Sequence, residues 1–591
     1  MWLGCGTEPL CCLQPPDSAD THSSHGMAQL TIQQIFDLAL QHHRAGRLHE
    51  AEQFYRQILD RDPQNADALH LLGVIAHQAG RNDIAADFIL RAIALNPRFP
   101  EAHSNLSHVL KDMGNPDQAI AAGRQAIFLN FNFPDAHNNL GNALREKGQL
   151  DEAIAAYRQA IALRPDYGQA HSNLGNALRE KGKLDEAIVA CRRAILLKPD
   201  LADAYNNLGT ALHECGRFDE ALNAYRQAIA LKPAYAQAQA NLAVSLQDSG
   251  QFVEALAAHR QAIALDNHLP LGHLNLAYAL LIRGDYQHGW EEHEWRWKCK
   301  ESSSIPRGFA QPQWDGHPLD DRILLLHAEQ GLGDAIQFVR YLPFVARRAR
   351  RIVVECQPQL HRLFQSIVQT IPQTACVQCQ FVSRGDALPP FDFHCPLLSL
   401  PLVFKTTLES IPADVPYLFP EPNLVELWRN KLNPAGTELK IAINWAGNPA
   451  YKGDRTRSIS LQRLAPLARA RGAIFYSVQK GAAAAQVNQS PTGLRLVDLS
   501  PDFDNTAAIM SLMDLVITTD TSMAHLAGAL GRPTWVMLQF VADWRWMLDR
   551  GDSPWYPSMR LFRQPAIGDW DGVVEEVAQA LAARAKDPNP G

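Results

Sequence analysis

A strict repeat of 34 residues constrains the fold of this chain more than any other feature of its sequence. Leucine recurs at one register from Leu38 to Leu276, and alanine recurs at another from Ala51 to Ala255. Glycine recurs eight times between them, at Gly46, Gly80, Gly114, Gly148, Gly182, Gly216, Gly250 and Gly284. A period of this length predicts a stack of helix pairs, each of which buries its apolar face against its neighbours.

The residue types at these positions predict how each unit is built. The leucine packs the first helix, the glycine permits the tight turn that ends it, and the alanine lets the second helix approach closely. Proline stops the second helix in most units, at Pro63, Pro97, Pro165, Pro199 and Pro233. This pattern resembles the tetratricopeptide repeat. Eight registers account for residues 29–300, and the eighth is incomplete because Gly289 stands at the alanine position.

Asparagine directly precedes six of the repeated leucines, at Asn105, Asn139, Asn173, Asn207, Asn241 and Asn275. In a stack of helix pairs these side chains are expected to form a ladder along the concave surface. A carboxamide donates and accepts hydrogen bonds, so it can pair with the backbone of an extended peptide. The ladder resembles that of protein O-GlcNAc transferase, which implies a protein or peptide acceptor. Asparagine is also common here in tetratricopeptide repeats generally, so a purely structural role stays open.

Composition excludes several classes of protein. The chain has 591 residues, of which 46% are apolar, and a formal charge of −7. The apolar fraction excludes wholesale disorder, and the acidity disfavours nucleic acid as a partner. No uninterrupted apolar run is long enough for a transmembrane helix, although peripheral membrane contact stays open. Scattered cysteines favour a cytoplasmic location, and residues 1–28 are predicted to be a disordered leader or an early start codon.

The second half of the chain follows a different pattern. Periodicity fails over residues 301–321, which are predicted to be a linker. Short apolar runs then alternate with helical stretches, which is typical of parallel βαβ units. Candidate strands are residues 323–327, 352–356, 391–395, 439–444, 473–478, 494–499, 515–518, 534–538 and 559–562. A proline-rich break divides two predicted Rossmann-like lobes, residues 322–420 and 421–585, before a tail of residues 586–591.

Two local motifs carry the candidate chemistry. Gly331-Leu332-Gly333-Asp334 lies between a strand and a helix, where glycines let the backbone approach a ligand. Ile336 replaces the third glycine of a dinucleotide fingerprint, and the pair would serve a tight turn equally well, with Asp334 as a helix cap. The second motif runs from Asp520 to His525. It follows a strand and opens a short helix whose first amides can bind a diphosphate.

Together the two motifs resemble those of the heptosyltransferase-like glycosyltransferases, which are similar to glycosyltransferase family 9 and have the GT-B fold of two Rossmann-like lobes. The resemblance covers residues 321–585 and implies that Asp334 is the general base. It implies a diphosphate site formed by Arg457, Asp520, Thr521, Ser522, Met523 and His525. It further implies possible donor contacts from Gly331, Gly333, Lys452, Arg455, Gln479 and Lys480. Ser522 departs from the family, which often has glycine there.

We therefore expect an α-solenoid followed by a GT-B enzyme that transfers a sugar from a nucleotide-diphosphate donor to a protein hydroxyl. No metal or cofactor is expected, because a helix N-terminus and a basic side chain can stabilise the leaving group. Two alternatives stay open. The acceptor can instead be a glycan or lipid-linked saccharide, or the domain can be inactive and the chain a protein-binding scaffold.

Three further clusters have a functional and a structural interpretation. Residues 347–351 contain four arginines, which can face an acidic partner or simply end a solvated helix. Trp544, Trp546 and Trp555 can stack on a sugar or pack between the lobes. Cys376, Cys379, His394 and Cys395 have poor spacing for a zinc site, so reduced structural thiols are expected.

Overall fold

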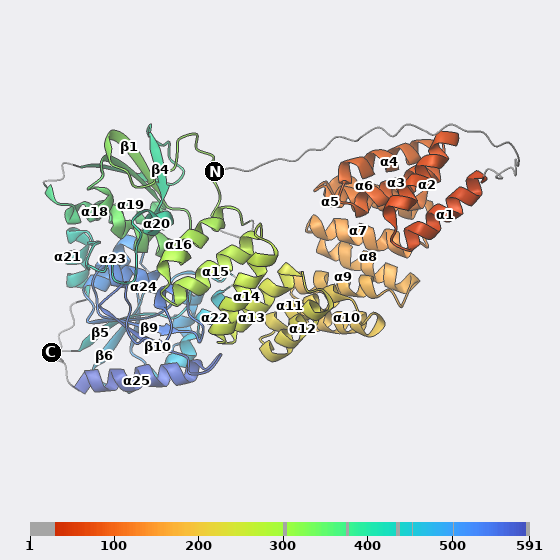
Figure 1. Cartoon of the computed structure of the whole chain (residues 1–591). Coiled ribbons are helices and arrows are strands. Elements are labelled where there is room, and N and C mark those ends of the chain that lie inside the picture. The colour runs from red at the N-terminus through yellow and green to blue at the C-terminus, as the bar shows by residue number, and fades with distance from the viewer. Residues whose placement is uncertain are drawn as a thin grey trace, which may run out of the picture. The chain divides into compact units, whose positions relative to one another are not determined.

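The computed structural model describes residues 30–299, 304–373, 377–432, 438–451, 453–499 and 501–586. The predicted leader and Lys452 lie outside these ranges, as do the first residues of the predicted linker and nearly all of the predicted tail. The chain forms two compact units that divide after Leu197, within the repeats. We describe each unit by itself (Figure 1). The predicted domain boundaries stay predictions.

Unit 1 consists of antiparallel helix pairs in the predicted register. Its helices are α1 (Ile32–Arg44), α2 (Leu48–Arg61), α3 (Ala66–Gln78), α4 (Asn82–Leu95), α5 (Pro100–Asp112), α6 (Pro116–Leu129), α7 (Pro134–Glu146), α8 (Leu150–Leu163), α9 (Gly168–Glu180) and α10 (Leu184–Leu197). Gly148 shows why glycine recurs between the helices of each pair. Its φ is +78°, in the left-handed region, whereas no atom lies within 4 Å of a Cβ built there. Backbone conformation, and not lack of space, therefore requires the glycine.

The repeated leucines and alanines occupy the predicted core positions. Ala153 and its equivalents have almost no exposed surface, and the leucines from Leu72 onward are buried. Leu38, in the first repeat, is half-buried. The small side chain at the alanine position allows the close packing of the two helices that the sequence predicts.

Unit 2 begins with the remaining repeats and continues into two parallel sheets. The helices of the repeats are α11 (Ala202–Glu214), α12 (Phe218–Leu231), α13 (Ala236–Asp248), α14 (Phe252–Leu265), α15 (Pro270–Ile282) and α16 (Tyr286–His293), followed by the 3-10 turn η1 (Glu294–Trp297). The strands are β1 (Leu319–His327), β2 (Ala349–Cys356), β3 (Gln378–Ser383), β4 (Phe393–Pro396), β5 (Leu439–Asn444), β6 (Ala473–Ser477), β7 (Leu496–Asp498), β8 (Leu515–Thr519), β9 (Thr534–Leu538) and β10 (Met559–Arg563).

Helices and 3-10 turns connect these strands. The helices are α17 (Leu332–Phe338), α18 (Leu342–Val345), α19 (His361–Gln365), α20 (Leu400–Val403), α21 (Pro422–Lys431), α22 (Asp454–Arg457), α23 (Phe503–Ser511), α24 (Ser522–Ala529) and α25 (Trp570–Lys586). The 3-10 turns are η2 (Val339–Tyr341), η3 (Pro358–Leu360), η4 (Ser366–Thr370), η6 (Leu397–Ser399), η7 (Leu461–Arg469), η8 (Gly481–Gln489) and η9 (Trp544–Trp546). In Figure 1, α25 runs along the edge of the region formed by the second sheet.

Both sheets are parallel and reverse their strand order at one point. The first has the order β3-β2-β1-β4, and the second has the order β10-β9-β8-β5-β6-β7. The second sheet thus has the strand order of a doubly wound dinucleotide-binding fold, with its reversal between β5 and β8. Ligands of such sheets bind outside the carboxyl ends of the strands at this reversal. The sequence analysis predicted every strand but β3, which alternates polar and apolar residues at the sheet edge.

A buried aromatic joint holds the last repeat against both sheets. Trp290 of α16 packs against Trp544, with ring centroids 5.2 Å apart, and its indole N–H donates to the carbonyl of Thr406 at 3.0 Å. The Trp555 indole N–H donates to the Tyr286 hydroxyl at 3.2 Å. These rings share one buried core with residues of both sheets. The packing interpretation is therefore confirmed for Trp544 and Trp555.

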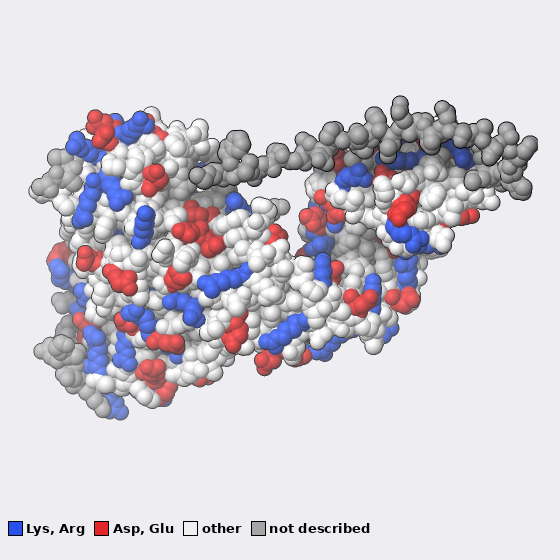
Figure 2. Space-filling view, viewed as in Figure 1, with Lys and Arg blue, Asp and Glu red and all other residues white. Residues whose placement is uncertain are grey.

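Among the residues that the structure describes, no helix combines the length and the apolar character that a bilayer crossing requires. Lysine and arginine side chains are interspersed with aspartate and glutamate over the face drawn in Figure 2.

Candidate functional site

The candidate site lies where the strand order of the second sheet reverses. Asn444 at the end of β5 accepts a hydrogen bond from the Thr521 hydroxyl at 2.9 Å. The Asn444 amide donates to Gln479 Oε1 at 2.8 Å, and this oxygen also accepts from the backbone amides of Trp445 and Ala446. Gln479 is buried, and its amide also donates to two carbonyls. Its side chain therefore holds the strand ends in place, and a direct donor contact stays a prediction.

Helix α24 presents free amides at this point. Thr521 is its N-cap, and its hydroxyl accepts from the Met523 amide at 3.3 Å. Within the described residues, the amides of Thr521 and Ser522 have no protein acceptor. Two unpaired donors at the positive end of a helix can bind an anion. The Met523 amide donates to the Thr521 hydroxyl, so it would have to give up this hydrogen bond to bind the same anion.

Arg457 supplies a cation close to this helix. Its Nε lies 3.3 Å from Asp454 Oδ1, and its guanidinium lies 4.7 Å from the centre of the Tyr451 ring. A Cβ on Gly447 would lie 3.0 Å from Arg457 Nη2 and only 2.3 Å from Asp454 Oδ1. Glycine after β5 therefore makes room for this pair. The arginine side chain is partly exposed, so it can meet a ligand.

Asp520 is buried beside these groups. Burial, together with the nearby Asp543 carboxylate, raises the pKa of its carboxyl to about 6, whereas Arg457 opposes the shift. A carboxyl with a strongly raised pKa in a ligand site is a candidate for proton exchange. An ionised Asp520 would repel a diphosphate, so a direct role in holding phosphate requires its proton.

The first sheet contributes Asp334, which follows β1 at the third position of α17. Its Oδ2 accepts a hydrogen bond from the Gly331 amide at 3.0 Å, so the helix-cap interpretation is confirmed. Its Oδ1 forms an ion pair with Arg545. The side chain is 21% exposed, which leaves it accessible at the site. The predicted general base is therefore already paired before any substrate arrives.

Arg545 is the residue that connects the carboxylates of the site. Its guanidinium donates to Asp543 Oδ1 at 2.9 Å and to Gln337 Oε1 at 2.6 Å, in addition to Asp334. Burial works to lower its pKa, but Asp543 and Asp334 raise it above the ordinary value. Sequence analysis missed this arginine. The sequence marks it only by its position between Trp544 and Trp546, and the sequence analysis considered only the tryptophan rings.

Helices α17 and α24 pack directly against each other at this site. A Cβ on Gly333 would lie 2.8 Å from His525 Cδ2, so glycine is needed for the close approach. The His525 ring stacks on Trp546, and its Nδ1 lies 3.0 Å from the Tyr556 hydroxyl. Burial, with Arg545 nearby, lowers the pKa of His525 well below its usual value. Gly333 and His525 thus pack the first sheet region against the second. Contacts of these two residues with a sugar-nucleotide donor stay predictions.

The last repeat also reaches the site. Tyr278 of α15 has a raised pKa, chiefly because of burial, and the charges of Asp543, Arg545 and Asp334 act on its hydroxyl. Helix α15 also packs against η9, which contains Arg545. Sequence analysis did not single out Tyr278, because it occupies an ordinary helix position within a repeat.

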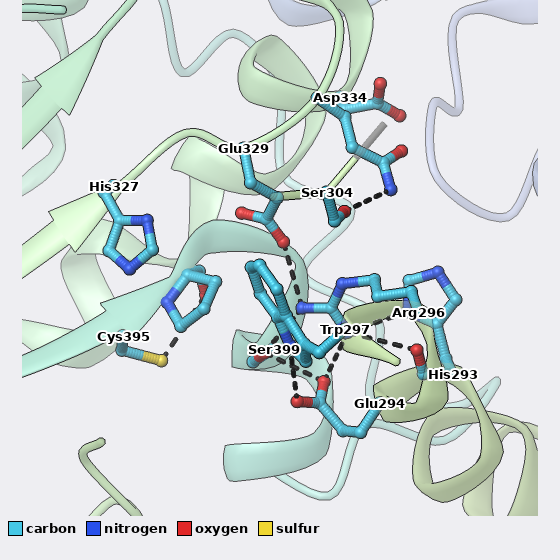
Figure 3. Close-up of polar contacts among 12 residues, drawn as sticks. His293, Glu294, Arg296, Trp297, Ser304, His327, Glu329, Asp334, Cys395 and Ser399 are labelled. Carbon is cyan, nitrogen blue, oxygen red and sulfur yellow. Dashed lines mark hydrogen bonds and ion pairs between the residues drawn. The ribbon is translucent and has the colours of Figure 1, made fainter. Parts of the chain in front are cut away.

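A buried ion pair joins the end of the repeats to the loop before Asp334 (Figure 3). Arg296 of η1 has no exposed surface and contacts Glu329 at 2.9 Å, Glu294 at 2.6 Å and Ser399 at 2.7 Å. Burial raises the pKa of Glu329 to about 7, although Arg296 opposes this. Removing the arginine would leave a buried, unpaired carboxylate in the segment that leads to Asp334.

The asparagine ladder forms mainly between neighbouring repeats. The asparagine side chain of one repeat contacts a residue of the preceding repeat in four cases. Asn105 lies 2.8 Å from His70 Nε2, Asn139 donates to Ser104 at 3.0 Å, Asn173 to Asn138 at 2.9 Å, and Asn241 to Asn206 at 3.0 Å. Asn207 and Asn275 occupy the same register. All six side chains stay partly exposed, so a second amide hydrogen can still meet a peptide; that contact stays a prediction.

Other predicted residues have structural partners. Lys480 contacts the Pro501 carbonyl, and burial lowers its pKa. Arg455 donates to the Glu214 carbonyl at 3.4 Å. Arg348 donates to the Gly316 carbonyl at 2.8 Å, beside an open pocket that also includes Asp320. Among the described cysteines, Cys379 and Cys395 are free thiols, and Cys376 lies outside the described residues.

Comparisons with known proteins address the repeats. Family profiles described as tetratricopeptide repeat match residues 36–100 and 236–265, and one described as TPR repeat matches residues 141–178, 175–214 and 209–250. The chain carries tetratricopeptide repeats. The tetratricopeptide register thus extends from unit 1 into unit 2.

One curated relative and several solved structures are similar to parts of the chain. Protein FlbA of Caulobacter vibrioides is 28% identical over 322 residues, which cover 51% of this chain and 53% of FlbA. The match thus spans about half the length of that relative. The APC/C heterotetramer Cut9–Hcn1 is 21% identical with a TM-score of 0.38, covering 41% of this chain and 48% of that chain. MamA is 27% identical with a TM-score of 0.25, covering 28% and 92%. A thermophilic TPR protein of Thermus thermophilus is 25% identical with a TM-score of 0.29, covering 31% and 98%.

The two glycines of the first motif are expected to respond differently to substitution. Gly333→Ala places a methyl group against His525 and should destabilise the protein by about 1–3 kcal/mol. Gly331→Ala is the matched control, because its φ is −72° and the nearest atom to an added Cβ is Asp334 Oδ2 at 3.2 Å. Urea unfolding measures both changes. Equal losses in the two variants would contradict the packing role of Gly333.

The raised pKa of Asp520 predicts a pH-dependent stability difference. The pKa of Asp520 is about 6 in the folded protein and lies above the ordinary value of 3.8. The contribution of this carboxyl to stability is therefore fully present below pH 3.8 and is lost as the pH rises through 6. Asp520→Asn should therefore gain stability relative to wild type between about pH 4 and pH 8, on the order of 2 kcal/mol. Urea unfolding at both pH values tests this. Asp571→Asn, at an exposed carboxylate, should show no such gain.

Proposed function

We propose that the protein is a glycosyltransferase that moves a sugar from a nucleotide-diphosphate donor to a hydroxyl of a polypeptide bound by the tetratricopeptide repeats. The observation that carries the proposal is the pair of unpaired amides at Thr521 and Ser522 beside Arg457, at the strand reversal of the second sheet. These groups are suited to a diphosphate.

Asp334 belongs to α17, which packs against α24, and is the candidate base. In the proposed reaction the acceptor oxygen attacks the anomeric carbon, and the bond from that carbon to the diphosphate breaks. The nucleoside diphosphate leaves with the bonding electrons, and the acceptor proton goes to the Asp334 carboxylate. Amides and arginines stabilise the charge that develops on the leaving group.

Arg545 gives the site a means of coupling donor binding to the base. It is paired with Asp334 and Asp543 in the free protein. A diphosphate that draws the guanidinium toward itself would weaken its pairing with Asp334 and leave that carboxylate able to accept a proton. The same arginine would then add positive charge at the leaving group.

The repeats support a polypeptide acceptor. Their partly exposed asparagines offer backbone-directed hydrogen bonds, and Tyr278 brings the last repeat to the site. A glycan or lipid-linked saccharide remains the second acceptor class from the sequence resemblance. Identifying the modified molecule separates the two.

Asp334→Asn should abolish transfer but not donor binding. The amide oxygen can still accept from Gly331, so the helix cap survives, whereas proton acceptance is lost. We expect at least about a hundredfold loss of transfer. Intact mass spectrometry of host proteins, with and without the chain, would detect a sugar increment that depends on Asp334.

Asp543→Asn is the matched control, because Asp543 also pairs with Arg545 but is not the proposed base. It should retain transfer. Full activity of Asp334→Asn would contradict the base assignment. Donor hydrolysis without any protein mass shift would favour the saccharide acceptor.

Arg457→Ala should weaken binding of a nucleoside diphosphate. Losing one charge-assisted contact is expected to raise the dissociation constant about tenfold or more. Titration calorimetry with UDP, GDP and ADP measures this. Arg455→Ala is the control, because Arg455 contacts the Glu214 carbonyl instead. Unchanged affinity in Arg457→Ala for a nucleotide that the wild type binds would refute the proposed diphosphate site.

A further inference from the structure

A cluster of two histidines and one aspartate lies within unit 1. His77 comes from α3, whereas His108 and Asp112 lie one turn apart on α5. Side chains four residues apart share one face of a helix, so both can meet a residue of the neighbouring helix. The ligating atoms of all three side chains lie within 4.8 Å of one another.

The separations suit a small divalent cation. Asp112 Oδ2 lies 2.7 Å from His77 Nε2 and 3.7 Å from His108 Nε2. Ligands bound tetrahedrally at metal distances of about 2.0–2.1 Å are separated by roughly 3.3 Å, which falls between these values. Small side-chain rotations can therefore bring the three atoms to one ion.

The chemistry of the cluster favours an ion of the zinc type. Two imidazoles and one carboxylate form a donor set used for zinc and its neighbours in the first transition row, and they leave one coordination position open. All three side chains are partly exposed, so an ion can reach them.

The repeats themselves provide an internal comparison. His213 and Asp248 occupy the equivalent positions in later repeats and lie 3.2 Å apart. Arg145 and Glu180 form the same kind of link at 2.8 Å. A basic–acidic contact is thus an ordinary feature of this register. Val244 stands at the position equivalent to His108. The second histidine therefore distinguishes the cluster of His77, His108 and Asp112 from the His213–Asp248 pair.

We propose that His77, His108 and Asp112 bind one divalent cation of the zinc type, which links α3 to α5. The ion replaces the His77–Asp112 contact with bonds to all three side chains. Lys111 Nζ, 2.5 Å from Asp112 Oδ1, moves away or keeps only that second oxygen. This proposal does not depend on the proposed transferase activity.

The test compares Zn²⁺ binding by the full chain and by His108→Val, which copies the residue of the later repeat. Titration calorimetry after treatment with a chelator should show one site in the wild type that His108→Val weakens at least about tenfold. His213→Leu is the matched control and should keep that site. Circular dichroism checks that each variant folds.

Two further measurements keep the proposal falsifiable. Asp112→Asn should weaken the same site, because an amide is a poorer zinc ligand than a carboxylate. Co²⁺ should give the visible absorption of a four-coordinate ion in the wild type and lose it in His108→Val. Equal Zn²⁺ binding by wild type, His108→Val and Asp112→Asn would overturn the proposal, as would absence of binding by the wild type.

Discussion

The aromatic joint around Trp290, Trp544 and Trp555 is the contact on which the rest of unit 2 depends. It places side chains of the last repeat and of both sheet regions in one buried core. Arg340 reinforces it from within, since its guanidinium donates to the Trp555 carbonyl at 2.6 Å and to the Tyr417 hydroxyl at 2.9 Å. Large buried rings contribute more apolar contact than any other side chains. The repeats and sheets of this unit therefore form one body, not modules on a loose tether.

The candidate site contains more carboxylates than guanidinium groups. Among the residues that the structure describes there, the carboxylates of Asp334, Asp520 and Asp543 are offset chiefly by two guanidinium groups, those of Arg457 and Arg545. Carboxylates are thus in excess, which is one reason why the pKa of Asp520 rises. An incoming diphosphate would add negative charge, so its binding must be offset by the unpaired amides, by redistribution of Arg545 or by proton uptake. Simple charge complementarity does not describe this site.

Local patterns allowed much of the fold to be predicted from the sequence. The repeat register follows from glycines whose backbone has a left-handed φ and from alanines that are fully buried. The buried strands were visible as apolar runs. Strand β3 escaped because an edge strand is half solvated and its residues alternate. Asp334 and the Thr521 segment were found because each lies at a strand–helix junction.

The sequence by itself determined the repeating helices, the parallel strands and the two strand–helix junctions of the candidate site, because these depend on neighbours in the chain. Only the tertiary structure decided what those junctions contact. Asp334 and Arg545 are separated by 211 positions, and Arg296 lies 33 positions from Glu329. No local pattern encodes such pairings, because they arise when distant segments are packed into one core. The same packing pairs the predicted base, Asp334, with Arg545 and places Gly333 against His525 between two helices.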